Sequence, residues 1–271
     1  MKSRAEVDAF QRTLRETGSY RTDPSRPRAA LGRFDSWYYL RLLRLVYLGH
    51  RLAARGEFDL KAWAAHSLTF LSIVEECGGT VELSGLEHPL KLGRPCVFVG
   101  NHMSLIEAFL LPGMLLHIGS IAPVIKESLL DYPLLGSFAR AIDPIRVGRR
   151  SPKEDLMAVL DQGKKFLGQG RSVVLFPQAT RAPRFDPSAF NTLGVKLARA
   201  AGVPVIPLAL KTDFQRNGSL IKDLGTLDRS QVVHFRFGEP MTVQGTGKDV
   251  NESVVRFITE SLREWDGQSG R

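Results

Sequence analysis

Cysteine is scarce in this sequence, and long hydrophobic runs are absent. The 271 residues include only Cys77 and Cys96, so we expect neither a disulfide framework nor a structural zinc site, and reduced thiols are the default. No stretch reaches the ~18 consecutive apolar residues that a membrane-spanning helix requires. Residues 1–21 are mixed in charge and lack a continuous apolar core, which argues against a secretory signal peptide.

Several well-known catalytic and binding motifs are also missing. No G-x-S-x-G sequence surrounds a serine, no Walker A sequence is present, and the histidines do not follow metal-ligand spacing. A serine hydrolase, a P-loop protein and a metalloenzyme are therefore disfavoured, and we predict no metal ion and no cofactor. Basic residues occur without helix-turn-helix, zinc-finger or aromatic RNA-binding patterns, so we predict no nucleic-acid partner.

Acidic residues are too few to balance the basic ones. The chain has 28 Asp and Glu against 37 Lys and Arg, which gives a formal net charge of +9 and a pI near 9.8. Such an excess favours an anionic membrane surface or phosphorylated substrates as partners, and the alternative is a solvated basic surface. Hydrophobic residues make up 43% of the chain, which is ordinary for a globular protein that buries a core.

Residues 37–48 form the most apolar stretch near the N-terminus, but Arg41 and Arg44 interrupt it. Because an arginine at the centre of a bilayer costs about 2.5 kcal/mol or more, we do not expect this stretch to span a membrane. Three aromatic residues beside leucines and arginines are typical of an amphipathic helix that lies in the membrane interface. The alternative is a helix that packs on the protein core.

The hydrophobic pattern changes near residue 79. Before it, the spacing of apolar residues predicts helices over 2–17, 35–54 and 59–76. After it, short apolar strands alternate with helices, which is typical of an α/β domain whose mainly parallel central sheet is flanked by helices. We therefore predict N-terminal helices over 1–78, including the membrane-docking helix, and an α/β domain over 79–271. The expected strands are 80–84, 96–99, 172–176, 203–210 and 232–237, and the expected helices are 105–116, 127–140, 152–169, 188–201 and 251–265.

Two reactive side chains follow the strand expected at 96–99. In open α/β sheets, functional groups gather at the carboxyl ends of strands. Gly100 permits a sharp exit from the strand, so His102 is presented at the strand end and Glu107 lies in the first turns of the next helix. A carboxylate that folds back onto one ring nitrogen fixes the tautomer and leaves the other nitrogen free as a base. The alternative is a structural histidine paired with a surface glutamate.

A second group of polar residues follows the strand expected at 172–176. Pro177 ends the ladder pairing of that strand. Thr180 and Arg181 then project a hydroxyl and a guanidinium from the edge of the sheet. Arginine is suited to bidentate contact with phosphate, and the alternative is a solvated surface charge.

These segments resemble the motifs of the glycerolipid acyltransferases, a family that includes bacterial lysophosphatidic acid acyltransferases. His102 and Glu107 resemble its H-x4-D motif, and the sequence FPQATR at 176–181 resembles its F-P-E-G-T-R motif. Two other blocks, at 126–149 and 203–208, are similar to further family blocks and occur in the same order. The resemblance therefore rests on four ordered blocks.

The resemblance implies a mechanism without a covalent acyl-enzyme. His102 would act as general base on the acceptor hydroxyl and would be oriented by Glu107. Arg149 and Arg181 would hold the acceptor phosphate. The substrate-binding residues implied in this way are Lys126, Arg149, Gln178, Thr180 and Arg181.

Three positions depart from the family pattern. Glu107 stands where the family has Asp, Gln178 where it has Glu, and Ala179 where it has Gly. The first change preserves a carboxylate, whereas the second removes a negative charge beside the expected phosphate site. The acceptor is therefore either a lysophospholipid such as 1-acylglycerol-3-phosphate or another lyso-lipid, such as a lyso-aminolipid.

The resemblance also implies partners and a location. The acyl donor would be acyl-carrier protein or acyl-CoA, and the protein would bind an anionic membrane surface at the cytoplasmic face of the cell membrane, as a peripheral or monotopic protein. The alternative hypothesis outside the enzyme class is a catalytically inactive protein that binds lipid at the membrane.

Overall fold

The computed structural model describes residues 1–178, 180–219 and 221–269. The helices are α1 (Arg4–Thr17), α2 (Asp35–Ala54), α3 (Leu60–Glu76), α4 (Glu87–Leu92), α5 (Ile106–Leu115), α6 (Leu135–Ala141), α7 (Pro152–Gly168), α8 (Leu193–Ala201) and α9 (Lys248–Ser269). The strands are β1 (Tyr20–Arg21), β2 (Thr80–Ser84), β3 (Val97–Gly100), β4 (Ile121–Lys126), β5 (Ile145–Val147), β6 (Ser172–Leu175), β7 (Val205–Lys211) and β8 (Val232–Phe237). Short 3-10 helices cover Glu127–Asp131 and Pro187–Ala189.

The strands form one mixed, mostly parallel sheet in the order β1-β2-β8-β7-β3-β6-β4-β5. The β1–β2 and β7–β8 pairs are antiparallel, and the other five pairs are parallel. Parallel strands need helices on both faces to bury them, and the continuous apolar runs of β3 and β7 are buried throughout. The predicted α/β fold with N-terminal helices is therefore confirmed.

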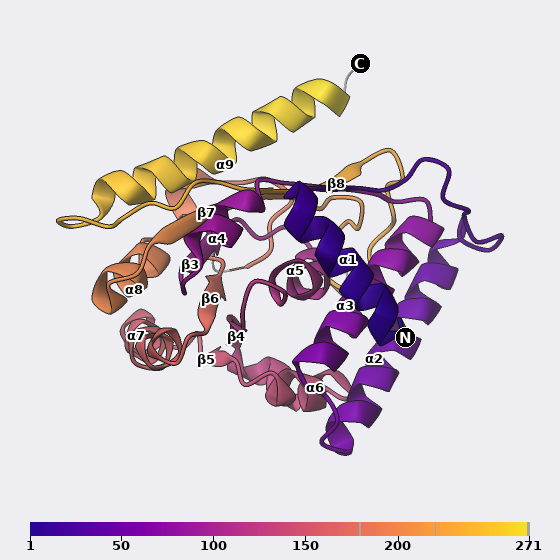
Figure 1. Ribbon diagram of the computed structural model, residues 1–271, viewed down its shortest axis with the longest axis horizontal. Coiled ribbons are helices and arrows are strands. Elements are labelled where there is room, and N and C mark those ends of the chain that lie inside the picture. The colour runs from indigo at the N-terminus through magenta and orange to yellow at the C-terminus, as the bar shows by residue number, and fades with distance from the viewer. Residues whose placement is uncertain (179, 220, 270–271) are drawn as a thin grey trace.

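Helices cover both faces of the sheet (Figure 1). One hydrophobic core lies under α1, α2, α3 and α5, and the second lies under α7, α8 and α9. In Figure 1, α7 and α8 lie at the left of the molecule, while α2 and α6 lie at the right. The two flanks of the sheet are therefore built from different parts of the chain.

Two predicted helices are wrong in their extent. The helix expected over 188–201 begins only at Leu193, after the 3-10 turn Pro187–Ala189. The helix expected over 127–140 is replaced by the 3-10 turn Glu127–Asp131 and the shorter α6. Pro133 disfavours a helical conformation in the residue before it, and Tyr132 accordingly has an extended conformation with φ −67° and ψ 134°. The strands β1, β4 and β5 and the short helix α4 were not predicted. β1 and β5 are short and lie at the edges of the sheet, and β4 contains Pro123, which weakens the strand pattern.

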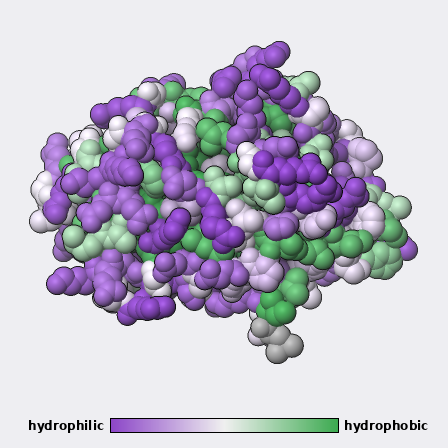
Figure 2. Space-filling model, turned by 90° about the horizontal axis from the view of Figure 1, so that it is seen from below, coloured by the Kyte–Doolittle hydropathy of each residue, from purple (hydrophilic) through white to green (hydrophobic). Residues whose placement is uncertain are grey.

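Helix α2 has one side that packs on the core and an opposite side with exposed apolar residues. One side packs on the core through Tyr38, Leu42 and Leu45, which recur at helical spacing. Leu40, Leu43 and Tyr47 are on the exposed side, with 56%, 57% and 47% of their surface accessible. In the view from below, hydrophobic residues gather along the lower right edge, on the side where α2 lies (Figure 2). Across the described helices, no segment has the length and apolar character needed to cross a bilayer.

The carboxyl ends of β3 and β6 lie side by side because the two strands pair in parallel, with Val99 opposite Leu175. On the other side of β3, Gly100 is opposite Leu208 of β7. A Cβ atom at Gly100 would lie 2.8 Å from the Leu208 carbonyl oxygen, so close approach of the backbones requires glycine here. The segments that follow β3, β6 and β7 consequently meet at one edge of the sheet.

Candidate active site

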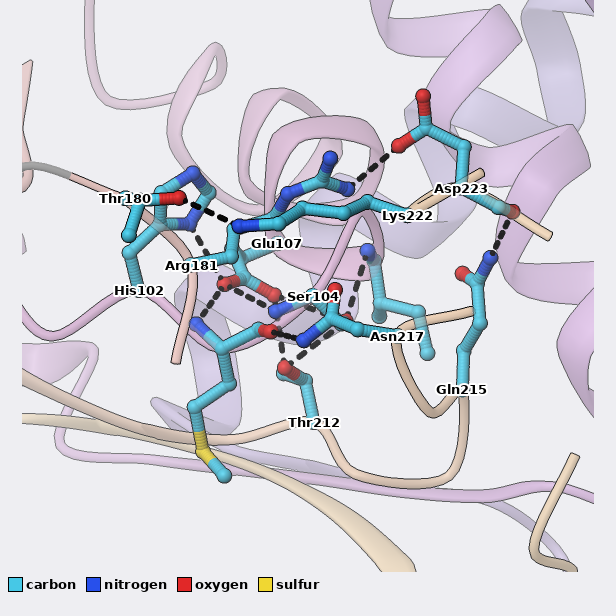
Figure 3. Close-up of polar contacts among 12 residues, drawn as sticks. His102, Ser104, Glu107, Thr180, Arg181, Thr212, Gln215, Asn217, Lys222 and Asp223 are labelled. Carbon is cyan, nitrogen blue, oxygen red and sulfur yellow. Dashed lines mark hydrogen bonds and ion pairs between the residues drawn. The ribbon is translucent and has the colours of Figure 1, made fainter. Parts of the chain in front are cut away.

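The site is centred on His102 and Glu107, which the turn between β3 and α5 brings together as the sequence predicts. The imidazole Nδ1 lies 2.8 Å from Glu107 Oε1. The histidine side chain retains 20% of its surface accessible, whereas the carboxylate is fully buried. Because an ionised carboxylate only accepts hydrogen bonds, Nδ1 carries the proton and Nε2 is left with a free lone pair. The second ring nitrogen faces away from Glu107 (Figure 3).

Hydrogen bonds saturate the Glu107 carboxylate. Its Oε1 also accepts the backbone N–H groups of Met103 at 2.6 Å and Ser104 at 2.9 Å. Its Oε2 accepts the Thr212 hydroxyl at 2.7 Å, and the Ser104 hydroxyl lies 3.1 Å away. Burial raises the pKa of Glu107, but the hydrogen bond and charge of His102, with the Thr212 hydroxyl, outweigh it and hold the pKa below its ordinary value of 4.5. The carboxylate is therefore ionised and fixed at neutral pH.

The segment after β6 holds the histidine from its other side. The Phe176 ring stacks on the His102 ring with centroids 4.6 Å apart and planes 13° apart. The side-chain oxygen of Gln178 accepts the His102 backbone N–H at 2.7 Å, and the His102 carbonyl accepts the Ala182 N–H at 3.0 Å. The imidazole is thereby confined between a carboxylate and an aromatic face, which fixes the direction of Nε2.

A cavity of about 630 Å³ opens beside His102. Apolar side chains from the ends of β4, β5 and β6 and from the first turns of α7 and α8 form much of its wall. Gln178 and Arg149 line it, as do Lys153 and Lys196. The structure thus brings His102, Gln178 and Arg149 together around one cavity.

Arg181 and Thr180 lie against the loop that follows β7 and are not among the described residues that line the cavity. Arg181 Nη1 lies 2.5 Å from Asp223 Oδ1, and Lys222 Nζ donates to the Thr180 hydroxyl at 2.8 Å (Figure 3). The loop is tied to α2, because Tyr39 donates its hydroxyl to the Gly225 carbonyl. The two predicted residues therefore face a group of charges that the sequence pattern does not reveal.

The remaining predicted residues lie on neighbouring strand ends. Lys126 ends β4 and is exposed, and its register partner in β5 is Val147, two residues before Arg149. Lys126 is not one of the described residues that line the cavity. Arg149 adopts a left-handed conformation with φ 57°, and its backbone N–H donates to Asp155 at 3.0 Å. Ala179, which replaces the family glycine, lies outside the described residues.

Sequence reasoning missed Thr212, Lys153, Lys196 and Asp223. Thr212 directly follows β7, so the rule that functional groups gather at the carboxyl ends of strands could have found it. Asp223 lies in an irregular loop and offers no such signal. Among the described residues, no cluster of three or more His, Cys, Asp or Glu side chains is arranged to hold a metal ion.

Comparisons with known proteins find a family profile and several relatives that match this chain. A profile of the acyltransferase family matches residues 80–211. A 1-acyl-sn-glycerol-3-phosphate acyltransferase of Pseudomonas aeruginosa is 30% identical over 216 residues, which cover 78% of this chain and 79% of that protein. A lyso-ornithine lipid O-acyltransferase of the same organism is 27% identical over 169 residues, covering 56% and 61%.

The fold is also similar to a solved structure. The 1-acyl-sn-glycerophosphate acyltransferase of Thermotoga maritima superposes with a TM-score of 0.60 at 20% identity, covering 85% of this chain and 93% of that one. At this identity the likeness supports the fold alone. The matched profile and the 30% identity over most of both chains show that this chain belongs to the acyltransferase family.

Proposed function

We propose that this protein transfers a fatty acyl chain from acyl-carrier protein or acyl-CoA to the free hydroxyl of a lysophospholipid such as 1-acylglycerol-3-phosphate. The contact of His102 with the buried Glu107 carboxylate is the observation that carries this proposal. A base with a fixed tautomer beside a cavity is what activation of an alcohol requires. The relative in Pseudomonas aeruginosa supports the choice of acceptor, because its name states that it acylates 1-acyl-sn-glycerol-3-phosphate.

In the proposed reaction, the acceptor O–H gives its proton to His102 Nε2 while its oxygen forms a bond to the thioester carbonyl carbon. The C–S bond then breaks, and the thiolate takes the proton from the imidazolium and leaves as the free thiol. One ester bond replaces one thioester bond, and no oxidant or reductant is needed. Glu107 stabilises the imidazolium that exists between the two proton transfers.

Acceptor recognition is assigned to the cations beside the base. Arg181 offers a guanidinium for phosphate, and the acceptor phosphate would take the place of the Asp223 carboxylate that now contacts it. Thr180 offers a hydroxyl on the same segment, with Lys222 beside it. Lys126 and Arg149 follow the adjacent strands β4 and β5 and add positive charge at the same edge of the sheet.

Docking on the membrane is assigned to α2. Its exposed Leu40, Leu43 and Tyr47 offer apolar contact, and Arg44 is exposed beside them. Burial of apolar side chains together with attraction of arginine to anionic lipid is sufficient for peripheral binding at the cytoplasmic leaflet. Replacement of Leu40 and Leu43 by serine should weaken co-sedimentation with vesicles that contain anionic lipid, while transfer to a detergent-dispersed acceptor should be retained.

The test of the reaction is transfer of a labelled acyl chain from acyl-carrier protein to 1-acylglycerol-3-phosphate by the purified protein and by His102→Ala. Loss of the general base should lower the rate by ~10²-fold or more. His88→Ala, on α4, is the matched control and should retain the wild-type rate. No transfer by the wild type to any acceptor, from either donor, would instead favour an inactive lipid-binding protein.

A second acceptor class has its own support. One relative is a lyso-ornithine lipid O-acyltransferase, and Gln178 places a neutral carboxamide where the family motif has a carboxylate. A panel of acceptors separates the two candidates. A rate that depends on the acceptor phosphate supports the lysophospholipid, whereas equal or higher rates on a phosphate-free lyso-aminolipid support the second class.

A further inference from the structure

The cavity beside His102 is walled by elements that lie away from the proposed membrane-docking helix α2. Its walls come from α7, α8 and the ends of β4, β5 and β6. In Figure 1, α7 and α8 lie at the left of the molecule and α2 lies at the right. A lipid acceptor that leaves the bilayer beside α2 therefore approaches the histidine from the opposite side. The cavity is left available for a ligand that arrives from water.

The lining of the cavity is suited to a chain with an anionic end. Leu156, Leu175 and Leu193 are among its apolar residues, and Lys153 and Lys196 are at its rim. Arg149 and Asp155 also line it, so the fixed charges of the lining sum to positive. The volume of about 630 Å³ is in the range of sites for small molecules and cofactors.

Two of these cations lack a counter-charge. Within the part of the chain that the structure describes, neither Lys153 nor Lys196 makes an ion pair or a hydrogen bond through its ammonium group. Lys153 also lies in the first turn of α7, a helix of 17 residues, where backbone N–H groups and the helix dipole favour an anion. A cavity with apolar walls and unneutralised lysines points to a phosphate-bearing ligand.

We propose that this cavity binds the phosphate-bearing pantetheine arm of the acyl thioester donor, with Lys153 and Lys196 contacting its phosphate. The assignment rests on the proposed function and adds the donor subsite to it. The acceptor phosphate is only a few bonds from its reacting hydroxyl and needs a cation next to His102, which Arg181 provides. The donor phosphate is separated from the thioester by the whole pantetheine arm, so its cations need not lie next to His102. Lys153 and Lys196 line the same cavity that His102 lines.

Steady-state kinetics with three donors test the proposal. The donors are acyl-carrier protein, acyl-CoA and an acyl-pantetheine that lacks phosphate, each with the same acceptor. The double variant Lys153→Ala/Lys196→Ala should raise KM by about tenfold for a donor that carries phosphate, because each partly screened charge contributes a few-fold. For acyl-pantetheine the variant and the wild type should have the same KM. Lys164→Ala, an exposed lysine of α7 that is not one of the cavity residues, is the matched control.

The donor series also separates the two sources of phosphate. An equal effect on acyl-CoA and acyl-carrier protein means that the shared phosphate of the pantetheine arm is bound. An effect on acyl-CoA alone would place its nucleotide phosphates in the site and overturn the assignment to the arm. A raised KM for the acceptor with unchanged donor KM values would overturn the proposal and make this the acceptor site. Absence of transfer by the wild type with all three donors would instead refute the proposed function itself.

Discussion

Replacement of Glu107 by glutamine tests the reasoning about the active site most directly. The carboxylate is fully buried, contacts His102 Nδ1 at 2.8 Å and accepts two backbone N–H groups. A glutamine has almost the same shape, and its carbonyl oxygen can accept the same donors at the position of Oε1. Its amide nitrogen then meets the hydroxyls of Ser104 and Thr212, which can rotate to accept. The substitution therefore removes one charge and leaves the packing in place.

The expected loss can be estimated from that charge. Two unit charges about 4 Å apart in an effective dielectric constant of about 20 attract each other by about 4 kcal/mol. If proton transfer to His102 is half complete in the transition state, the glutamine variant loses about 2 kcal/mol of this attraction. If proton transfer is complete, the variant loses the full ~4 kcal/mol. These energies correspond to a fall in kcat of about 30-fold to about 10³-fold. KM for the acceptor should change little, because the neutral histidine binds substrate in both proteins.

Initial rates of acyl transfer by the wild type and Glu107→Gln at neutral pH test this prediction. Thermal melting of both proteins checks that the variant is folded. Glu260→Gln on α9 removes an exposed carboxylate and should retain full activity. The pKa of Glu107 lies below its ordinary value, so the carboxylate is ionised at neutral pH and the substitution removes a full negative charge there. A cooperative melt with more than half of the wild-type kcat would refute the role of this charge.

The remaining predictions concern the length of the side chain at position 107, the competition of Asp223 with the acceptor phosphate for Arg181, and the pH dependence of stability. Glu107→Asp restores the residue of the family motif but shortens the side chain by one methylene. Because the backbone places five hydrogen-bond donors around the glutamate carboxylate, kcat should fall by about tenfold. A rise in kcat would show that the backbone is not matched to glutamate. Asp223→Asn removes the carboxylate that contacts Arg181, so KM for a phosphate-bearing acceptor should fall by about twofold to threefold in the same assay, and an increase would mean that Asp223 orients the arginine for binding. Burial lowers the pKa of His66 from 6.5 to about 4, so its neutral form stabilises the fold fully above pH 6.5 and about 3 kcal/mol is lost as the pH falls through 4. Urea unfolding of the wild type and His66→Gln at pH 7 and pH 4.5 should show a smaller pH dependence in the variant, which keeps a donor for the Leu45 carbonyl.

The strand-end chemistry could be predicted because it depends on local rules. Hydrophobic strands of four or five residues mark β3 and β6, and the residues that follow a parallel strand must lie at the carboxyl edge of the sheet. This is sufficient to place His102 and Gln178 at the same edge of the sheet, and the pairing of β3 with β6 then brings them into contact. The five-residue spacing to Glu107 is sufficient for the carboxylate contact, because a turn separates the strand from α5.

Other parts of the site depend on long-range packing that a single sequence does not encode locally. Thr212 reaches Glu107 only because β7 lies next to β3, and strand order is a property of the whole sheet. Asp223 meets Arg181 because an irregular loop is anchored to α2 through Tyr39 and through the Asp35–Arg229 ion pair. Neither the hydrophobic period nor a turn signal specifies such contacts.

On the proposed function, the same packing would let one histidine serve two substrates of different solubility. The acceptor side of His102 is formed by Arg181 and the loop attached to α2, whose exposed leucines are assigned to the membrane. The donor side is formed by the first turns of α7 and α8, which belong to the other hydrophobic core and lie at the opposite flank of the sheet (Figure 1). Because the base lies on the segment between the two, a lipid can approach from the bilayer while a water-soluble thioester approaches from solvent. Variants of Arg181 should therefore change the KM of the acceptor, and variants of Lys153 and Lys196 should change the KM of the donor. Variants of His102 and Glu107 should instead change kcat for every combination of donor and acceptor.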